Sequence, residues 1–297
     1  METTLTKNQN LTAEKVKARG LDAKQKKTIV LLLQHFILIL GCIVVLAPMV
    51  IIFFNSFKTA EEYIYGNVFK IPESFLYFQN YWVAFIQGKL LEGFKNSAIL
   101  VVSSCFISIL LGTMVAYALG RFEFKGKRTI MLLYTIAAIV PSITTQVATF
   151  SLIKGLGLYN TLGAGILLFS GTDLIQIYIY LQFIDNIPYA LDESAKLDGA
   201  SYLCVFRKII FPLLKPATIT VIIIKVISIY NDLYTAHLYM PKFKTISTAL
   251  YTFSGENNTQ WNIMSAAIIL ALIPTLIIFF TLQKYIYGGI TTGSVKG

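Results

Sequence analysis

The chain has 297 residues, of which 56% are hydrophobic and 13% are charged, and its formal net charge is +10. An ordinary soluble domain is about 45–50% apolar and about 25% charged, so this composition excludes a typical soluble protein and favours a chain solvated by lipid. The positive charge does not indicate nucleic-acid binding, because the basic residues fall between apolar runs instead of building one compact basic fold.

Six apolar stretches are each long enough to cross about 30 Å of hydrocarbon as a helix, which takes roughly 17–25 residues. They cover residues 29–54, 97–119, 130–153, 162–184, 212–230 and 263–282. The sequence therefore predicts an all-α polytopic membrane protein with about six transmembrane helices. Its membrane domain is expected to span residues 29–284, between a polar tail at 1–28 and a second tail at 285–297.

The lysines and arginines predict how these spans are oriented. The short segment Gly120 to Arg128 joins two spans and carries four basic residues, which resist translocation across the membrane. The tail at 1–28 is also rich in lysine. We therefore expect a multi-pass protein of the cell membrane with both termini in the cytoplasm, and with segments 55–96 and 231–262 on the outer side.

Polar residues interrupt the third, fourth and fifth stretches. Pro141 begins a polar run inside the third, and Asp173 ends a polar run inside the fourth. A carboxylate or an ammonium at membrane depth needs protein or water around it. Asp173 could therefore face a polar path or make a hydrogen bond between helices, and Lys225 in the fifth stretch could instead extend to the outer interface.

The segment 186–212, between the fourth and fifth stretches, is too polar to span a membrane. Pro188 suits the first turn of a helix that should run to about Lys196. Gly199 can adopt the left-handed backbone that ends a helix, and Asp198 can cap a second helix after it. The pattern predicts two short helices that meet at an elbow.

This elbow resembles the EAA loop of binding-protein-dependent ABC importer permeases, whose pattern is Glu-Ala-Ala-x-x-Asp-Gly-Ala followed by Phe, Ile and Pro. The chain reads Glu193-Ser-Ala-Lys-Leu-Asp-Gly-Ala200, with Phe206, Ile209 and Pro212 downstream. Ser194 replaces the usual alanine. Tyr230-Asn231-Asp232 resembles the Trp-Asn-Asp of the carbohydrate branch, and the ending Val295-Lys296-Gly297 resembles that of the maltose-type subunit.

The resemblance implies a type I ABC importer permease fold in which the loop docks on a cytoplasmic ATPase. It implies that Glu193 pairs with a basic residue of that ATPase. The residues expected to couple the two proteins are Leu191, Glu193, Ala195, Asp198, Gly199, Ala200, Leu203 and Phe206. An amphipathic helix on the membrane surface is the alternative, which the acidic Glu193 and Asp198 disfavour at an anionic leaflet.

A permease of this type would work with a second homologous permease, two ATPase subunits and an extracytoplasmic solute-binding protein, within membrane lipid. The resemblance favours a sugar or oligosaccharide as cargo and leaves glycerol phosphate open. Polar residues of the spans are candidates for the translocation path, namely Thr144, Gln146, Ser170, Thr172, Asp173, Lys225, Asn231 and Asp232.

Missing motifs argue against an enzyme. The chain has no Gly-x-x-x-x-Gly-Lys-Ser/Thr phosphate loop, so we expect no cofactor on this chain, with ATP and Mg²⁺ held by partner ATPases. His35 and His237 lie far apart and the three cysteines form no metal-ligand spacing. An ion-coupled secondary transporter is the runner-up, but only Asp173 could carry the coupling ion. A membrane enzyme lacks any recognisable nucleophile and base.

Overall fold

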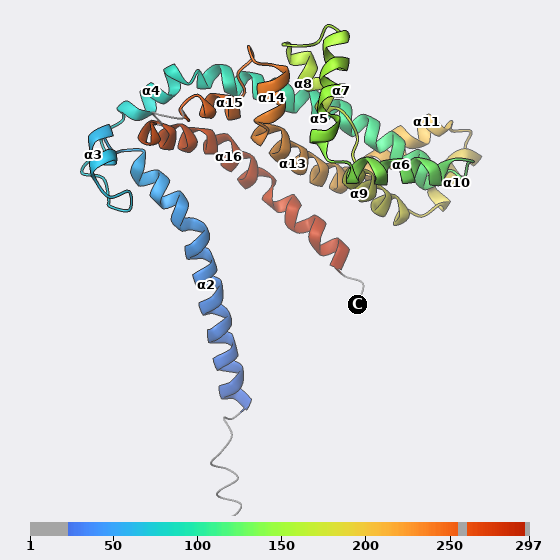
Figure 1. Cartoon of the computed structure of the whole chain (residues 1–297). Helices are drawn as coiled ribbons and strands as arrows, with labels where there is room; N and C mark the ends of the chain where they lie inside the picture. Colours follow the sequence, from blue (N-terminus) through green and yellow to red (C-terminus); the bar gives the residue numbers. More distant parts are fainter. Residues whose placement is uncertain (1–22, 255–259, 295–297) are drawn as a thin grey trace, which may run out of the picture. The chain divides into compact units, whose positions relative to one another are not determined.

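The computed structural model describes residues 23–254 and 260–294, and it shows no β-strand in those ranges (Figure 1). The Lys7 to Arg19 part of the basic tail and the Val295-Lys296-Gly297 ending lie outside the described residues. The chain divides into two units, Met1–Phe54 and Asn55–Gly297. The first unit contributes helix α2 (Ala23–Asn55), one apolar helix that matches the first predicted span.

The second unit consists of short and long helices in a single run along the chain. They are α3 (Ala60–Tyr65), α4 (Gln79–Gln87), α5 (Leu90–Arg121), α6 (Lys127–Ile139), α7 (Ser142–Gly155), α8 (Leu162–Phe169), α9 (Leu174–Asp185), α10 (Ala190–Leu197), α11 (Tyr202–Val205), a π-helical turn (Phe206–Ile210), α12 (Phe211–Leu213), α13 (Lys215–Asn231), α14 (Tyr234–Tyr239), α15 (Ile246–Tyr251) and α16 (Trp261–Ser294).

Three helices in the described ranges are each long and apolar enough to cross a membrane alone: α2, α5 and α16. Three further candidates are pairs of helices bent at a short break: α6 with α7 by 104°, α8 with α9 by 46°, and the Tyr202–Leu213 segment with α13 by 71°. If each bent pair is one span, the count is six, as predicted.

The break in the third predicted span is larger than a proline kink within one helix. Val140 and Pro141 both have extended backbone, with ψ angles of 119° and 130°. Steric contact with a proline ring disfavours helical backbone in the preceding residue, so two residues in succession leave the helix. The chain therefore turns by 104° between α6 and α7 instead of bending within one helix.

Helix α5 is the element around which the second unit packs. It contacts α8, α9 and α13, and it also contacts α4 and α15. In Figure 1 it runs from α4 and α15 at one end to α10 and α11 at the other. One buried cluster joins α5 to α9, α13 and the segment after α10, through residues that include Tyr117, Tyr180, Ile184, Phe206 and Ile210.

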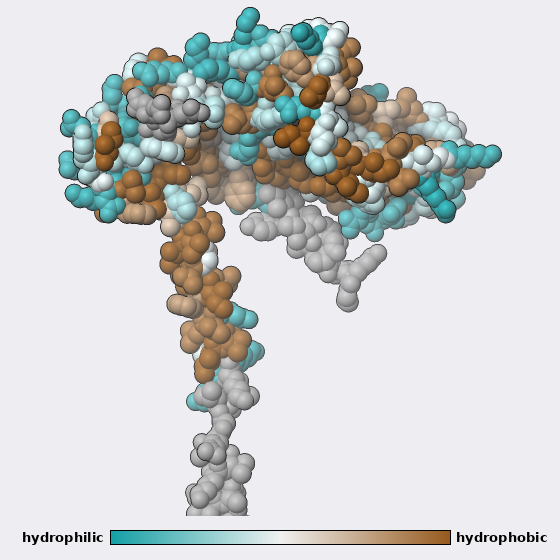
Figure 2. Space-filling view, viewed as in Figure 1, coloured by the Kyte–Doolittle hydropathy of each residue, from teal (hydrophilic) through white to brown (hydrophobic). Residues whose placement is uncertain are grey.

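Large apolar side chains cover much of the outer surface of the helices. Brown atoms line α2, and they also spread over the visible face of the second unit (Figure 2). On α5, Val102 and Phe106 are each exposed by about 70%. Exposed apolar surface on this scale indicates lipid or protein partners instead of water.

Candidate functional site

The elbow at segment 186–212 forms as predicted around Gly199. Helix α10 ends at Leu197, and Gly199 has a φ of +82°. The Ala200 N–H donates to the Ala195 carbonyl at 2.9 Å, and the Gly199 N–H donates to the Lys196 carbonyl at 3.0 Å. This pair of hydrogen bonds is the Schellman arrangement, which satisfies the last carbonyls of a helix and reverses the chain.

The cap of the second helix differs from the prediction. Ser201, not Asp198, is the N-cap of α11, and its hydroxyl accepts from the Cys204 N–H at 3.3 Å. Asp198 stands at the end of α10, too early in the chain to reach the free N–H groups of α11. The chain needs two residues after Asp198 to complete the turn, so the capping position falls on Ser201.

Helix α10 is fastened to the end of α5 by one arginine. The Nη2 of Arg121 lies 3.2 Å from the Asp192 carboxylate, and only 3% and 8% of the two side chains are exposed. Arg121 also donates to the Ile187 carbonyl at 2.8 Å, and its guanidinium lies 4.2 Å from the centre of the Tyr189 ring. The Tyr189 hydroxyl donates to the Gly120 carbonyl at 3.0 Å.

The second helix of the elbow is fastened to the same end of α5 by aromatic rings. The Phe122 and Tyr202 rings lie 5.0 Å apart edge to face, and those of Tyr117 and Phe206 lie 5.4 Å apart. Lys196 of α10 lies 4.4 Å from the Tyr202 ring, which links the two short helices. Such ring contacts each contribute about 0.5–1.5 kcal/mol beyond their burial.

The predicted coupling residues divide by exposure. Phe206 is 6% exposed and packs in the protein's own core, so it anchors the elbow and offers little surface to a partner. Ala195 and Ala200 are half-buried. The exposed members are Leu191, Glu193, Asp198, Gly199 and Leu203. Within the described residues Glu193 makes no ion pair, so its charge is available to a partner.

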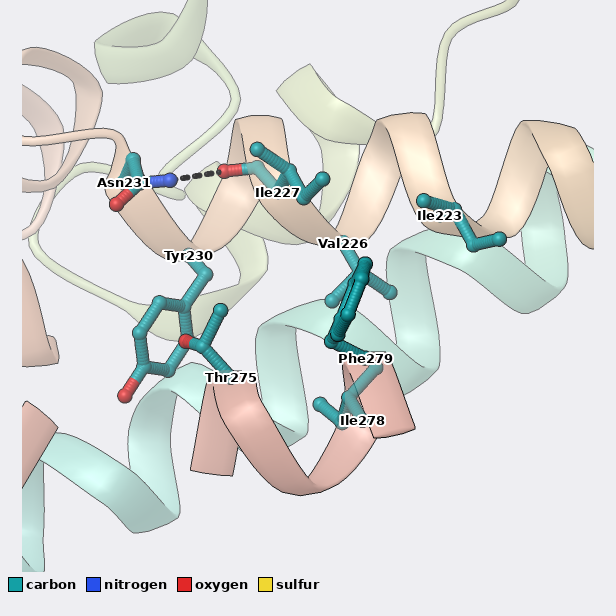
Figure 3. Close-up of a pocket in the computed structure, with 8 residues that line it drawn as sticks. All are labelled: Ile223, Val226, Ile227, Tyr230, Asn231, Thr275, Ile278 and Phe279. Carbon is teal, nitrogen blue, oxygen red and sulfur yellow. Dashed lines mark hydrogen bonds between the residues drawn. The ribbon is translucent and has the colours of Figure 1, made fainter. Parts of the chain in front are cut away.

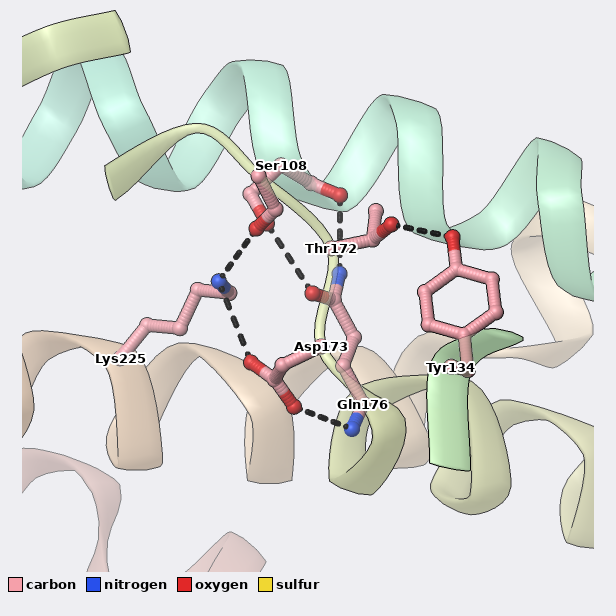
Figure 4. Close-up of polar contacts among 7 residues, drawn as sticks. Ser108, Tyr134, Thr172, Asp173, Gln176 and Lys225 are labelled. Carbon is pink, nitrogen blue, oxygen red and sulfur yellow. Dashed lines mark hydrogen bonds and ion pairs between the residues drawn. The ribbon is translucent and has the colours of Figure 1, made fainter. Parts of the chain in front are cut away.

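A second group of polar side chains gathers at the break between α8 and α9 (Figure 4). The Ser108 hydroxyl of α5 donates to the Gly171 carbonyl and to the Gln176 amide oxygen, each at 3.0 Å. The Gln176 amide donates back to the Ser108 carbonyl at 2.8 Å. Tyr134 of α6 shares a hydrogen bond of 2.6 Å with Thr172. Polar groups freed by the break are thereby satisfied by neighbouring helices.

Asp173 and Lys225 belong to this cluster. Asp173 is the N-cap of α9 and accepts from the Gln176 N–H at 2.8 Å, while its other oxygen lies 3.5 Å from the Lys225 ammonium. Lys225 also donates to the Gly171 carbonyl at 2.9 Å. The Lys225 side chain thus points to the break between α8 and α9. The alternative prediction had it extend along α13 to the outer interface.

The predicted path residues do not form one group. Thr172, Asp173 and Lys225 lie together at the break, and Ser170 beside them is buried and donates to the Ile166 carbonyl. The rest are separate, namely Thr144 and Gln146 on α7 and Asn231 and Asp232 at the end of α13. Asp232 accepts from Thr235, which ties it to α14.

The clefts along α13 include one polar and one apolar example. One of about 290 Å³ opens beside the polar cluster and is lined by residues that include Phe169, Thr172, Asp173, Lys225 and Ser228. The other, of about 190 Å³, lies between α13 and α16 and is almost wholly apolar, with Ile223, Val226, Thr275, Ile278 and Phe279 in its wall (Figure 3). The first offers charged groups and hydroxyls to a solute. The second also includes Tyr230 and the predicted path residue Asn231, but most of its wall is apolar.

Sequence reasoning missed several residues that the structure brings to these sites. The sequence marked Arg121 only as one of the basic residues that set the orientation in the membrane, and it assigned no role to Asp192. Ser108 and Gln176 were also missed, although a glutamine within an apolar stretch is a signal that could have marked the cluster. No group of three metal-ligating side chains occurs among the residues that the structure describes.

Comparisons with known proteins agree with one another. Residues 108–291 match the family described as the binding-protein-dependent transport system inner membrane component. The melibiose/raffinose/stachyose import permease protein MelC of Bacillus subtilis (strain 168) is 32% identical over 89% of this chain and 97% of its own length. The probable starch degradation products transport system permease protein AmyC of Thermoanaerobacterium thermosulfurigenes is 32% identical, over 84% and 92%.

The fold also matches a solved structure. A bacterial ABC transporter involved in the import of the acidic polysaccharide alginate contains a chain that superposes with a TM-score of 0.77. The match covers 90% of this chain and 99% of that one, at 21% sequence identity. The likeness confirms the predicted type I importer permease fold.

Proposed function

The chain belongs to the family of binding-protein-dependent transport system inner membrane components, and on that premise we propose that it is one permease subunit of an ATP-driven carbohydrate importer. In this proposal it receives a sugar or oligosaccharide from an extracytoplasmic binding protein. Two partner ATPases hydrolyse ATP, and a second homologous permease completes the path. One observation carries the proposal furthest, namely that Glu193 is exposed, and makes no ion pair within the described ranges, on an elbow fastened to α5.

The shape of the elbow supports docking on an ATPase. Glu193, Leu191 and Leu203 are exposed on it, while the Arg121–Asp192 pair and the Phe206 ring hold it from inside. A short helix with one free carboxylate and exposed leucines suits a groove that has an apolar floor and a basic rim. The left-handed Gly199 keeps the outer side of the turn free of a side chain, and open space surrounds it.

The cargo class is supported by the relatives and by the chemistry of the polar cluster. The two curated relatives are named for transport of melibiose, raffinose and stachyose and of starch degradation products. The cleft beside Asp173 and Lys225 offers one carboxylate, one ammonium group and the hydroxyls of Thr172 and Ser228. A neutral polyol can exchange hydrogen bonds with such groups without leaving a net charge in the membrane.

The same cluster disfavours an ion-coupled transporter. A coupling proton or sodium ion needs a carboxylate that is free to bind it. The Asp173 carboxylate already caps α9 and faces the Lys225 ammonium at 3.5 Å.

The membrane orientation that fits the proposal places segment 186–212 and both termini in the cytoplasm, where the ATPase subunits would be.

Reconstitution in liposomes tests the proposal. The chain is assembled with its candidate permease, ATPase and binding-protein partners, and uptake of labelled raffinose or maltodextrin is followed. We expect uptake to require ATP and the binding protein, and we expect Glu193→Ala to reduce it while the complex still forms. Glu193→Asp, which keeps the charge, is the matched control. Uptake driven by an ion gradient in the absence of ATP would overturn the proposal.

A further inference from the structure

We propose that Arg121 is the positioning residue that makes α5 move together with the coupling elbow. This inference rests on the proposed function, because it concerns how docking on an ATPase reaches the spans. Segment 186–212 joins α9 to α13 in sequence, so those two helices would be expected to receive its movement. Its buried side chains pack on both of those helices. Further side-chain contacts fasten it to α5, which lies far away in the sequence.

Both sequence neighbours of the elbow are connected to it through bends. The segment before α13 meets that helix at 71°. Between α9 and α10 the chain turns through Asn186 to Tyr189, and the N-cap of α10 has no side-chain hydrogen bond. A displacement of α10 would pass less directly to α9 and α13 through these bent connections than to a helix that side chains hold to α10.

Arg121 holds three groups of the elbow at once. It forms the ion pair with Asp192 at 3.2 Å, donates to the Ile187 carbonyl at 2.8 Å and stacks over Tyr189 at 4.2 Å. The guanidinium is planar and rigid, and its contacts with Asp192, Ile187 and Tyr189 point in different directions. Together they fix the orientation of α10 relative to the end of α5. A displacement of α10 must then displace Arg121 and its helix.

The hydrogen bonding of the pair is incomplete. Nε and Nη1 of Arg121 and Oδ2 of Asp192 are buried and have no hydrogen-bond partner among the residues that the structure describes. A buried charged group with unsatisfied donors costs free energy, and a two-bond arrangement between a guanidinium and a carboxylate would recover part of it. The observed geometry of the pair is therefore not its best-bonded one.

Helix α5 can carry such a displacement to the far side of the membrane. It has 32 residues, which at 1.5 Å per residue is about 48 Å. Its Ser108 contacts the polar break between α8 and α9. At its other end the Asn96 amide donates to the Lys244 carbonyl at 2.8 Å, and the Ser97 hydroxyl accepts from the Ile246 N–H at 3.0 Å. One helix thus joins the elbow, the cluster and the outer segment.

The test uses the full complex with its partners and measures sugar transported per ATP hydrolysed. Arg121→Met alone would leave the Asp192 carboxylate buried and unpaired, which can prevent folding. The informative variant is therefore Arg121→Met with Asp192→Leu, which removes both buried charges and keeps side-chain volume. We expect a complex that assembles and retains basal ATP hydrolysis, with a transport ratio at least roughly tenfold lower, within the range of coupling between distant sites.

A matched control removes another ion pair from the same region. Lys127 and Glu123 lie 2.7 Å apart on the exposed surface just beyond α5, and Lys127→Met with Glu123→Gln should leave the transport ratio unchanged. Arg121→Lys keeps the positive charge but loses the planar guanidinium, so its transport ratio should lie between that of the wild type and that of the double variant.

The outcomes separate the two proposals. A wild-type ratio in the Arg121→Met, Asp192→Leu variant overturns the role of Arg121 while leaving the importer intact. If the unmodified complex shows no ATP-dependent uptake, the proposed function fails instead. Loss of assembly in the double variant, with Arg121→Lys at the wild-type ratio, also counts against a positioning role, because it leaves only a structural one.

Discussion

Asp173 and Lys225 neutralise one another inside the membrane-spanning part of the chain, with the carboxylate 3.5 Å from the ammonium. Asp173 caps α9 and Lys225 lies on α13, so the elbow separates the two residues in the sequence. Their pairing explains how an acid and a base are tolerated among apolar spans, since an unpaired cation at the centre of a helix costs about 2.5–3.5 kcal/mol on insertion scales.

Neutralising one member of this pair should cost stability, and neutralising both should cost less. Asp173→Asn keeps an effective N-cap for α9 but leaves the Lys225 cation unpaired, so we expect the complex to lose about 1 kcal/mol, between an exposed and a buried pair. Lys225→Met in the same chain should recover part of that loss. Thermal unfolding of the purified complex, alongside uptake, measures both effects.

Uptake by the single variants decides the role of the pair in transport. If Asp173 and Lys225 contact the cargo, each single variant should transport more slowly even where the complex is stable. Wild-type uptake by both Asp173→Asn and Lys225→Met would show that neither group lines a necessary path.

Gly112 of α5 should not tolerate a methyl group. A Cβ at this position would overlap the side-chain amide of Gln176, which is held by two hydrogen bonds to Ser108. Gly112→Ala should therefore break those bonds and destabilise the protein by about 1–3 kcal/mol, despite the better helix propensity of alanine. Gly155→Ala is the control, because a Cβ there meets nothing within 4 Å. Equal stability of the two variants would contradict the close packing of α5 on α9.

Local patterns made part of the structure predictable. The apolar runs gave the positions of the spans because a helix needs a fixed length to cross hydrocarbon. Gly199 marked the elbow because only a residue without Cβ adopts a φ of +82° at little cost. Neither inference requires knowledge of a distant part of the chain.

The remaining features depend on contacts between distant segments. Arg121 and Asp192 are separated by 71 positions, so their pairing follows only once α5 and the elbow are packed together. Gln176 and Ser108 meet across 68 positions for the same reason. The N-cap of α11 is Ser201 and not the predicted Asp198. Helix ends are hard to predict to the exact residue, because a boundary can shift by a few positions while the sequence pattern stays the same.

Lys58 should prove to be a structural residue of segment 55–89. It is 1% exposed, and its ammonium donates to the Asn67 carbonyl at 2.9 Å and to the Val68 carbonyl at 3.2 Å. Lys58→Met would leave both carbonyls without this donor, so we expect local destabilisation of about 1–3 kcal/mol. Limited proteolysis should then cut the segment between α3 and α4 faster. Lys70→Met, at an exposed lysine nearby, is the matched control, and equal cleavage rates would rule out this role.

Substitutions at Gly199 should separate backbone conformation from side-chain contact. A Cβ there meets nothing within 4 Å, so the cost of a side chain arises from the φ of +82° alone. Left-handed backbone costs roughly 1–2 kcal/mol for most residues, less for asparagine and more for a β-branched residue. We therefore expect the elbow to be kept by Gly199→Asn, weakened by Gly199→Ala and reshaped by Gly199→Val.

Transport should follow the same order if the elbow couples ATP hydrolysis to uptake. Gly199→Val should insert and assemble, because the strained residue lies on the exposed turn and not in the core, yet it should hydrolyse ATP with little uptake. Gly199→Asn should keep most of the uptake per ATP. The ratio is measured in liposomes that contain the full complex. A normal ratio for Gly199→Val would refute the argument from the elbow, whereas failure of all three variants would mean that the outer side of the turn tolerates no side chain, as expected for a surface in direct contact with the ATPase.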